Sequence, residues 1–348
     1  MTIFHSGVPL KPEASDADGT GSDSAILNNM KALIFDNILK IREVPVPTPK
    51  PGEVLIRVLY SSICNTDQEI IKGYMGFSGI LGHEFVGEVV TGSSPLFGQR
   101  VVGEINCPCG HCYLCKTGRP THCANRTVLG IFNHDGVFAE YIVLPENNLH
   151  VVPVDLLSEI AVFTEPLAAA IEIFDQILIR PSQNVFIFGA GKLGSLISLV
   201  FRMNGCEYTT YDVNPGKVNH ARGMGINSAL ISSIGPSDKA EVCVDCTGSA
   251  EGIGMALSHL YPRGRLVLKT TVAETAKVDL NQVVINENQI IGSRCGPFAP
   301  ALKLLATGLV NPRPLITAIY PFESLPEAFE KAAQTDTIKV LVNHQKKD

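Results

Sequence analysis

Four cysteines stand close together in the sequence with the spacing of a metal-binding site. Cys109, Cys112 and Cys115 are each separated by two residues, and Cys123 follows after seven more. Four thiolates complete the tetrahedral coordination of Zn²⁺ and leave no open position, which is typical of a structural site. Disulfides are the alternative, but the chain is large and lacks a secretory signal, so we favour metal binding. Cys107, beside the array, is expected to be a bystander.

A glycine-rich loop follows the apolar run 185–188, which has the composition of a buried strand. Gly189 permits a tight turn, Gly191 lets the backbone approach a pyrophosphate, and Gly194 allows a helix to pack closely on the strand. The start of that helix offers unpaired N–H groups and a partial positive charge to phosphates. The alternative is a tight strand-to-helix turn that binds nothing.

Asp212 ends the next strand-like run, roughly 20 residues after the first glycine of the loop, as a ribose-binding carboxylate does. A carboxylate here can accept the hydroxyl groups of the adenosine ribose and would repel a 2′-phosphate. Residues 213–215 include no arginine that could bind such a phosphate. NAD is therefore favoured over NADP, unless Asp212 is an ordinary turn residue.

Further side chains of metal-binding type are scattered along the chain: Cys64, the neighbours His83 and Glu84, and Glu165. A thiolate, an imidazole and a carboxylate would neutralise Zn²⁺ and leave one coordination position for a substrate. Each residue alone has a plainer explanation, because an isolated Cys is usually part of the core and a His-Glu pair is usually a surface turn. Spacing alone does not unite them.

The segments that must position these side chains change in character near residue 155. From residue 30, short alternating patterns with Pro and Gly between them predict an irregular β-rich domain, which we expect to be a small barrel. Strand and helix patterns then alternate, which is typical of a doubly wound parallel sheet. We predict a flexible tail (1–29), a catalytic domain (30–154 and 296–348) and a dinucleotide-binding Rossmann domain (155–295). The expected helices span 156–177, 192–203, 217–224, 299–306 and 325–333.

Composition limits the classes of function. The 348 residues have a formal charge of −6, which gives no basic field for nucleic acid. No apolar run reaches the roughly 18 residues that a membrane span needs. The acidic, Gly- and Ser-rich start of the chain lacks the pattern of a secretory or transit signal, so we expect a cytoplasmic location.

Together these motifs resemble the medium-chain, zinc-dependent alcohol dehydrogenase superfamily. The resemblance covers nearly all of 30–343 and implies a GroES-like catalytic domain that works with the Rossmann domain to transfer hydride between an alcohol carbon and NAD. It also implies that Cys64, His83 and Glu165 bind the catalytic zinc, with Glu84 able to exchange into the shell. The motifs that carry the resemblance are 82–84, the four cysteines, 135–141, 165–167, the glycine loop and 245–248.

The same resemblance assigns roles around both sites. Thr66 would accept the alcohol proton, unless it is a plain turn residue, and Glu69 stands where the family often has a relay histidine. Liver-type enzymes carry Cys in place of Glu165, so the chain is more similar to the polyol, sugar and threonine dehydrogenase branches. Lys339 falls where an arginine often meets the pyrophosphate. The cofactor contacts expected besides the glycines and Asp212 are Lys192, Leu193, Lys217, Thr247 and Lys339.

We therefore predict the zinc-dependent, NAD-linked oxidation of a secondary alcohol, polyol or sugar to a carbonyl, and the reverse reduction. No pair of basic residues stands out for a charged substrate, which favours a neutral one. A homodimer or homotetramer is expected by resemblance. The alternatives are a zinc-free NADPH quinone or enone reductase and a non-catalytic nucleotide-binding protein on the same fold. Residues that could line the substrate pocket, or belong to the core, are Tyr74, Met75, Phe77 and Phe132.

Overall fold

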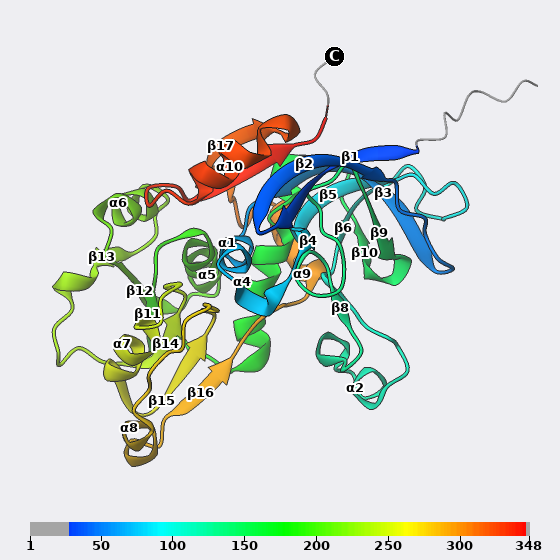
Figure 1. Cartoon of the computed structure of the whole chain (residues 1–348). Helices are drawn as coiled ribbons and strands as arrows, with labels where there is room; N and C mark the ends of the chain where they lie inside the picture. Colours follow the sequence, from blue (N-terminus) through cyan, green and yellow to red (C-terminus); the bar gives the residue numbers. More distant parts are fainter. Residues whose placement is uncertain (1–27, 346–348) are drawn as a thin grey trace, which may run out of the picture.

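The computed structural model describes residues 28–345, in which two large β-sheets lie side by side (Figure 1). The predicted tail lies outside the described residues as far as residue 27, and the first strand, β1, already begins at Asn29. Within the described range, no helix is both long and apolar enough to cross a membrane.

The first large sheet has seven strands and is centred on β3 (Glu53–Ser62). One edge of β3 pairs with β5 (Glu84–Val89). The other edge pairs with β9 (Tyr141–Pro145) along its first half and with β18 (Lys339–Asn343) along its last residues. Because β9 and β18 share this edge, the sheet branches at β3, and the expected barrel does not close. The remaining strands are β6 (Arg100–Gly103), β10 (Leu149–Val151) and β17 (Ile316–Pro321).

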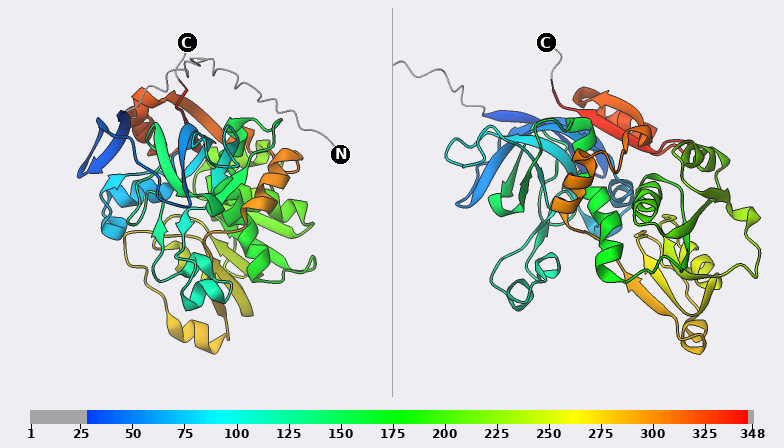
Figure 2. Two further views of the ribbon diagram at one scale, coloured as in Figure 1. Left: turned by 90° about the vertical axis from the view of Figure 1, so that its right-hand side faces the viewer. Right: turned by 180° about the vertical axis from the view of Figure 1, so that it is seen from behind.

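Two small sheets complete this part of the molecule. A three-stranded sheet has the order β2-β1-β4, and the pair β7-β8 lies at the base of the lobe that carries the four cysteines (Figure 1). The lobe contains the short helix α2 (Tyr113–Lys116) and projects from the body of the molecule in the views of Figures 1 and 2. The strands are β1 (Asn29–Asp36), β2 (Ile38–Pro45), β4 (Gly79–Ile80), β7 (Asn106–Cys107) and β8 (Thr127–Val128).

The second large sheet is parallel throughout and has the order β13-β12-β11-β14-β15-β16. The chain builds outward from β11 in one direction and from β14 in the other, so the strand order reverses between them. That reversal is the place where doubly wound sheets bind dinucleotides. The strands are β11 (Asn184–Phe188), β12 (Glu207–Asp212), β13 (Ser228–Leu230), β14 (Ala240–Asp245), β15 (Leu260–Leu268) and β16 (Gln289–Gly292).

The helix expected over 156–177 is broken into α3 (Ser158–Ala161) and α4 (Thr164–Gln176). Pro166 causes the break, because its ring conflicts with the carbonyl four residues earlier and is tolerated only in the first turn of a helix. The other helices are α1 (Asn65–Ile71), α5 (Lys192–Met203), α6 (Pro215–Gly223), α7 (Gly252–Ser258), α8 (Leu280–Ile285), α9 (Phe298–Ala306) and α10 (Leu325–Ala332).

The largest apolar core joins the two sheets. It contains Val185 and Val244 of the parallel sheet, helices α4 and α5, and Val86 and Leu341 of the first sheet. Because one continuous set of buried side chains touches both sheets, the carboxyl ends of β11 and β14 have a fixed position relative to β3 and β5. This shared core holds the residues of the candidate site in place.

Candidate active site and metal centres

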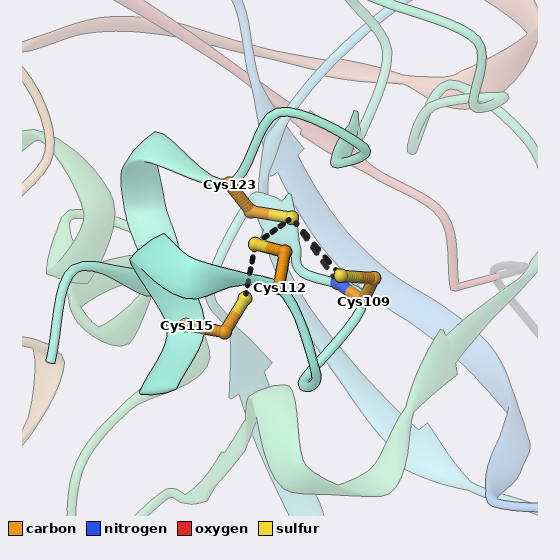
Figure 3. A group of neighbouring side chains, drawn as sticks. All are labelled: Cys109, Cys112, Cys115 and Cys123. Atoms are coloured by element: carbon orange, nitrogen blue, oxygen red, sulfur yellow. Dashed lines mark hydrogen bonds between the residues drawn. The ribbon is translucent and has the colours of Figure 1, made fainter. Parts of the chain in front are cut away.

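The four cysteines of the lobe face one another (Figure 3). The sulfur of Cys112 lies 3.5 Å from that of Cys115 and 3.7 Å from that of Cys123, which lies 3.5 Å from the sulfur of Cys109. Ligands at a Zn–S distance of about 2.3 Å around a tetrahedral ion have similar separations. All four ligand atoms lie within 4.8 Å of one another, and Cys107 is outside the group. The donor set fits a structural zinc ion, and every cysteine in the described range is free of disulfides.

Local backbone groups prepare one of these sulfurs to bind a cation. The backbone N–H groups of His111 and Cys112 hydrogen-bond to Cys109 and lower its pKa to about 6. A thiolate is therefore favoured near neutral pH, and the thiolate is the form that binds metal.

A second group of possible metal ligands comprises Cys64, His83 and Glu84, whose ligand atoms also lie within 4.8 Å of one another. Asp67, in the first turn of α1, contacts two members of this group, Cys64 and His83. It accepts a hydrogen bond from the backbone N–H of Cys64 at 2.8 Å, and its other oxygen lies 3.3 Å from Nδ1 of His83. Neither that oxygen nor Nδ1 completes a hydrogen bond, although both are buried. Burial alone would lower the pKa of His83, but Asp67 and Cys64 raise it well above its ordinary value.

Glu84 and Lys339 form a buried ion pair, and Ser62 also donates to the Glu84 carboxylate. Lys339 donates to the carbonyl of Ile63 as well, at 3.3 Å. Its amino group therefore lies beside the metal-ligand group, where it already has the Glu84 carboxylate as partner. Lys192, at the start of α5, donates to the same carbonyl at 3.2 Å, and burial followed by repulsion from Lys339 lowers its pKa. These contacts join the end of the glycine loop to the main chain at Ile63, the neighbour of Cys64.

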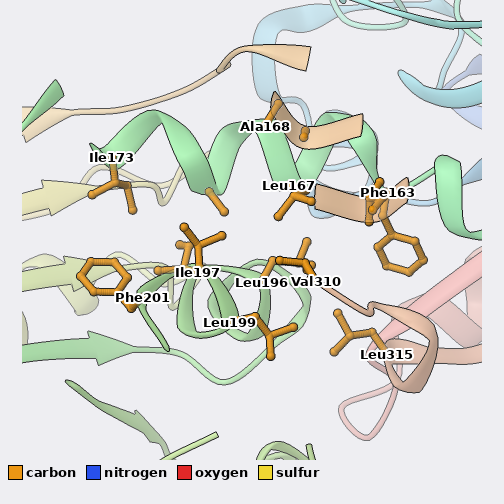
Figure 4. Close-up of a cluster of buried hydrophobic side chains, with 14 of the residues drawn as sticks. Phe163, Leu167, Ala168, Ile173, Leu196, Ile197, Leu199, Phe201, Val310 and Leu315 are labelled. Carbon is orange, nitrogen blue, oxygen red and sulfur yellow. The ribbon is translucent and has the colours of Figure 1, made fainter. Parts of the chain in front are cut away.

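Glu165 occupies the first turn of α4 and lies outside the 4.8 Å group. Burial raises its pKa to about 7, His83 lowers it and Glu84 raises it further, so the carboxyl group lies in the electrostatic field of the other candidates. Within the described residues, Glu165 has no hydrogen bond or ion pair. Figure 4 shows how α4 is anchored: Leu167 and Ile173 point toward Ile197 and Phe201 of the neighbouring helix α5.

Two further predicted residues lie on α1. The hydroxyl oxygen of Thr66 is 3.7 Å from the sulfur of Cys64, next to the metal-ligand group. Glu69 is buried, accepts from Lys72 at 2.9 Å and accepts from the backbone N–H of Ala273 at 3.2 Å. Glu69 thus connects α1 to the loop that follows β15 of the parallel sheet.

The glycine loop has the conformation expected of a phosphate-binding turn. Gly189 has φ of +108°, and a Cβ on Gly194 would lie 1.8 Å from the carbonyl oxygen of Gly189. A Cβ on Gly191 would meet no atom within 4 Å, so the loop is open on that side. Leu193 packs against the large core. Open space at the N-terminus of α5 fits the pyrophosphate of a dinucleotide.

Asp212 lies at the edge of this loop. One carboxylate oxygen accepts from the backbone N–H of Ala190 at 2.7 Å and the other from that of Asn214 at 2.8 Å. The side chain of Asn214 in turn caps α6 by accepting from the backbone N–H of Lys217 at 3.3 Å. Thr247 donates to Asp245 at 2.8 Å and shapes the turn after β14. All these residues border the point where the strand order reverses.

Three of the four candidate wall residues line one cavity of about 440 Å³: Met75, Phe77 and Phe132. His134 and Asp135 also line it. Tyr74 is partly buried against the core of the first sheet instead. Phe77 also packs against that core, and the cavity includes none of the candidate zinc ligands, so the role of these residues as substrate-pocket walls stays a prediction.

Sequence reasoning missed two residues that organise the site. Asp67 had a signal, since it follows Cys64 by three residues in a first-turn position where a side chain can reach back. Lys269 directly follows β15 and is almost fully buried. It donates to the carbonyl of Ala169 at 2.6 Å, to Ser293 at 2.9 Å and to the carbonyl of Arg294 at 3.0 Å. Burial lowers its pKa to about 8.

Comparison with known proteins agrees with this geometry. Residues 50–154 match the alcohol dehydrogenase GroES-like domain. An L-threonine 3-dehydrogenase of Coxiella burnetii is 30% identical over 328 residues, which is 85% of this chain and 94% of the relative. The structure of the rspB alcohol dehydrogenase of Escherichia coli CFT073 with NADH has a TM-score of 0.83 at 28% identity and covers 91% of this chain and 99% of that one.

A zinc-binding dehydrogenase of Sinorhizobium meliloti bound to NADP has a TM-score of 0.81 at 27% identity, with 90% and 99% of the two chains covered. The chain belongs to the medium-chain, zinc-dependent alcohol dehydrogenase superfamily. It is an oxidoreductase that acts on CH–OH groups of small molecules with zinc and a nicotinamide dinucleotide.

Proposed function

We propose that the chain oxidises a secondary alcohol, polyol or sugar derivative to the carbonyl compound with NAD, and catalyses the reverse reduction. The observation that carries the proposal is the convergence of Cys64, His83 and Glu84 within 4.8 Å. Lys192, at the end of the glycine loop, binds the carbonyl of Ile63, the residue before Cys64. The thiolate and carboxylate suit a divalent cation, and the open loop suits a dinucleotide. Zinc bound here supplies a Lewis acid that lowers the pKa of an alcohol hydroxyl, and NAD supplies the hydride acceptor.

The chain's own residues position the reactants and move the proton. Asp67 orients His83 so that the ring nitrogen opposite to Nδ1 faces the ligand group, as second-shell carboxylates do in zinc sites. Thr66, beside Cys64, accepts the hydroxyl proton at Oγ1 while donating its own proton onward. Glu69, further along α1, is the next acceptor available to that relay.

For the third zinc ligand we propose Glu165, with Glu84 as the residue that can exchange into the shell. The charge of Glu84 is already balanced by buried Lys339, whereas Glu165 has no ion-pair partner in the described part of the chain. A partly buried carboxyl group without a partner is costly to ionise, and a divalent cation removes that cost. A thiolate from Cys64 and one carboxylate then neutralise the ion.

For the cofactor we propose the glycine loop as the pyrophosphate site and Asp212 as the residue that selects NAD. The carboxylate lies at the loop and would repel the 2′-phosphate of NADP. Lys217, Thr247, Leu193 and the backbone at Lys192 border the same turn. Lys339 is proposed to act on the cofactor indirectly, because its amino group is engaged by Glu84.

We further propose that the chain is divided into a catalytic domain, 30–154 with 296–348, and a Rossmann domain, 155–295. The pairing of β18 with β3 supports the return of the C-terminal segment to the first domain. A homodimer or homotetramer formed through the outer edge of β16 is supported by the apolar surface beside it. Leu280, Val284 and Ile285 of α8 are 66%, 74% and 78% exposed.

The thiol chemistry supports a cytoplasmic location. The ten cysteines are free, and the four of the lobe could pair with one another in an oxidising compartment, because each of their sulfurs lies within 4 Å of another one. A reducing compartment keeps such thiols available for metal.

A substrate panel tests the proposed function. Simple alcohols, polyols, aldoses and amino alcohols are offered with NAD or NADP, and reduced nicotinamide is read by absorbance. We expect NAD-linked turnover of at least one class, loss of turnover after chelation and recovery when Zn²⁺ is restored. Turnover that survives complete removal of zinc, or reduction of enones with NADPH alone, would instead favour the zinc-free reductase.

A further inference from the structure

A group of basic side chains meets where the four-cysteine lobe touches the segment after β16. Arg294 donates to the carbonyl of Thr121 at 2.9 Å, and Arg126 donates to the carbonyl of Cys123 at 3.0 Å. These carbonyls belong to the two neighbours of His122, so the two guanidinium groups flank one residue. Arg119 precedes the short helical turn Pro120–His122, and its main-chain carbonyl accepts a hydrogen bond from the backbone N–H of His122 at 3.1 Å.

The charges of these arginines have no acidic partner in the portion of the chain that the structure describes. Arg119 donates to the hydroxyl of Thr117 at 3.2 Å and covers the ring of Tyr113. Nε of Arg126 is buried and has no hydrogen-bond partner. The cluster holds unused donors and uncompensated positive charge.

The main chain of the segment that carries Arg294 is tied to residues of the proposed catalytic site. The main-chain carbonyl of Arg294 accepts from Lys269, and the next residue, Cys295, lies 3.2 Å from the side-chain nitrogen of Asn106. Glu165 acts electrostatically on both Lys269 and Cys295. The residue that carries the guanidinium group is thus fixed to the group of side chains around Glu165.

The zinc-binding cysteines explain part of this charge. Four thiolates with one Zn²⁺ leave two negative charges on the lobe, which arginines of the lobe can balance. Arg294 is different, because it comes from the parallel-sheet side of the molecule and touches the lobe only at the carbonyl of Thr121. Its remaining guanidinium donors are free to bind a ligand.

We propose that Arg294, Arg126 and Arg119 form a subsite for an anionic group of the substrate, a carboxylate or a phosphate. Guanidinium groups suit both anions because their planar donors match two oxygens at once. The inference rests on the proposed function and narrows it to hydroxy compounds that carry such a group. This proposal differs from the neutral substrate expected from the sequence, in which arginines so far apart along the chain show no sign of lying together.

Binding of inorganic phosphate tests the subsite without any turnover. Phosphate is titrated calorimetrically into the zinc-loaded protein at low ionic strength, with zinc per chain measured for each variant. Loss of one charge-assisted hydrogen-bond partner costs about 1.5 kcal/mol, so Arg294→Gln should weaken phosphate binding about tenfold. Arg294→Lys should lose less. Arg263→Gln is the matched control. Arg263 lies on β15, outside the cluster, and is an exposed arginine paired with Glu287.

Two results would overturn the subsite. One is a phosphate affinity that is absent, or equal in the wild type, Arg294→Gln and Arg126→Gln. The other is loss of zinc from these variants with unchanged phosphate affinity in the molecules that keep it, which would make the arginines only a counter-charge for the cysteines.

Substrates distinguish the two sources of the anion. A polyol, its phosphate ester and the corresponding hydroxy acid are compared with NAD, and the kcat/KM ratio of the preferred anion to the neutral compound should fall about tenfold in Arg294→Gln. A ratio that stays constant contradicts the subsite, while turnover of the neutral polyol leaves the proposed function intact. If no alcohol is oxidised, the proposed function fails and the phosphate titration alone decides the subsite.

Discussion

Asp67 shows how one carboxylate can organise a metal-ligand group. It holds the backbone of Cys64 with one oxygen and faces Nδ1 of His83 with the other. Asp212 has a similar role at the glycine loop, where it binds two backbone N–H groups. In both places a short acidic side chain fixes the conformation of a backbone segment that must approach a ligand. Glu84 and Lys339 are buried charges paired with each other, whereas the partly buried Glu165 has no ion-pair partner in the described residues.

Cofactor choice is tested at Asp212. The double substitution Asp212→Gly with Val213→Arg removes the carboxylate that repels a 2′-phosphate and adds a cation that can bind it. The ratio of kcat/KM with NAD to kcat/KM with NADP should fall about 10- to 100-fold, the value of one or two charge-assisted hydrogen bonds. Kinetics with both cofactors measure it, and an unchanged ratio would show that Asp212 does not read the ribose.

At the scale of elements, the first turns of α1, α4 and α5 converge on one place. α1 brings Cys64 and Thr66, α4 brings Glu165, and α5 brings the glycine loop with Lys192. Lys269 connects two of the segments involved, because it binds the carbonyl of Ala169 in α4 and the segment after β16. Because this buried lysine donates to three acceptors, it fixes the position of α4 relative to the segment after β16 more specifically than apolar packing does.

Lys269→Met tests this connection. The substitution leaves Ser293 and two carbonyl groups without their donor, so we expect the free energy of unfolding to fall by about 1–3 kcal/mol. Because α4 carries Glu165, kcat should fall as well, while the NAD dissociation constant changes little. Thermal melts and steady-state kinetics measure both effects. Lys277→Met, an exposed lysine of the following loop, is the control, and equal behaviour of the two variants would argue against a positioning role.

The elements with strong periodicity could be predicted from the sequence. The alternation of strands and helices from Asn184 onward, the glycine loop and the four-cysteine lobe appear as predicted, because each depends on contacts between close neighbours in the chain. The break before Pro166 was missed, since the apolar pattern continues across it. The irregular barrel-like domain was predicted, but that its sheet stays open was not, because the sharing of one edge of β3 by β9 and β18 depends on pairing over about 280 residues.

Parts of the candidate site depended on the same long-range contacts. Lys339 was predicted as a cofactor contact, but its buried pairing with Glu84 requires β18 to lie beside β3. The joining of Arg294 to the lobe and of Glu69 to Ala273 likewise crosses between distant segments. Local spacing carries no information on such contacts.

At the scale of the whole molecule, the outer edge of the parallel sheet is the surface that we propose as the interface with a second copy of the chain. β16 is the last strand of the sheet, and an open strand edge with exposed apolar neighbours favours pairing with another chain. A second copy placed edge to edge would extend the sheet and cover α8. The catalytic group lies away from this edge, so assembly and chemistry can be tested separately.

Ile285→Glu tests the assembly. Ile285 is 78% exposed on α8, and a buried isoleucine contributes about 1.5–3 kcal/mol, so a charge there should raise the dimer dissociation constant at least about tenfold. Val154→Glu is the matched control, because Val154 is 90% exposed and lies in the loop between β10 and α3, outside the parallel sheet. Sedimentation at several concentrations measures the mass. A monomeric wild type, or equal masses for all three proteins, would contradict the proposed interface.

The central claim is that Cys64 is part of a catalytic zinc site distinct from the cysteine lobe. The most direct measurement is zinc per chain together with NAD-linked turnover in Cys64→Ser, with Cys107→Ser as control. The account predicts that Cys64→Ser retains one zinc ion of two and loses turnover, that Glu165→Gln does the same, and that Cys107→Ser retains both ions and full turnover. Two zinc ions and undiminished turnover in Cys64→Ser would contradict it.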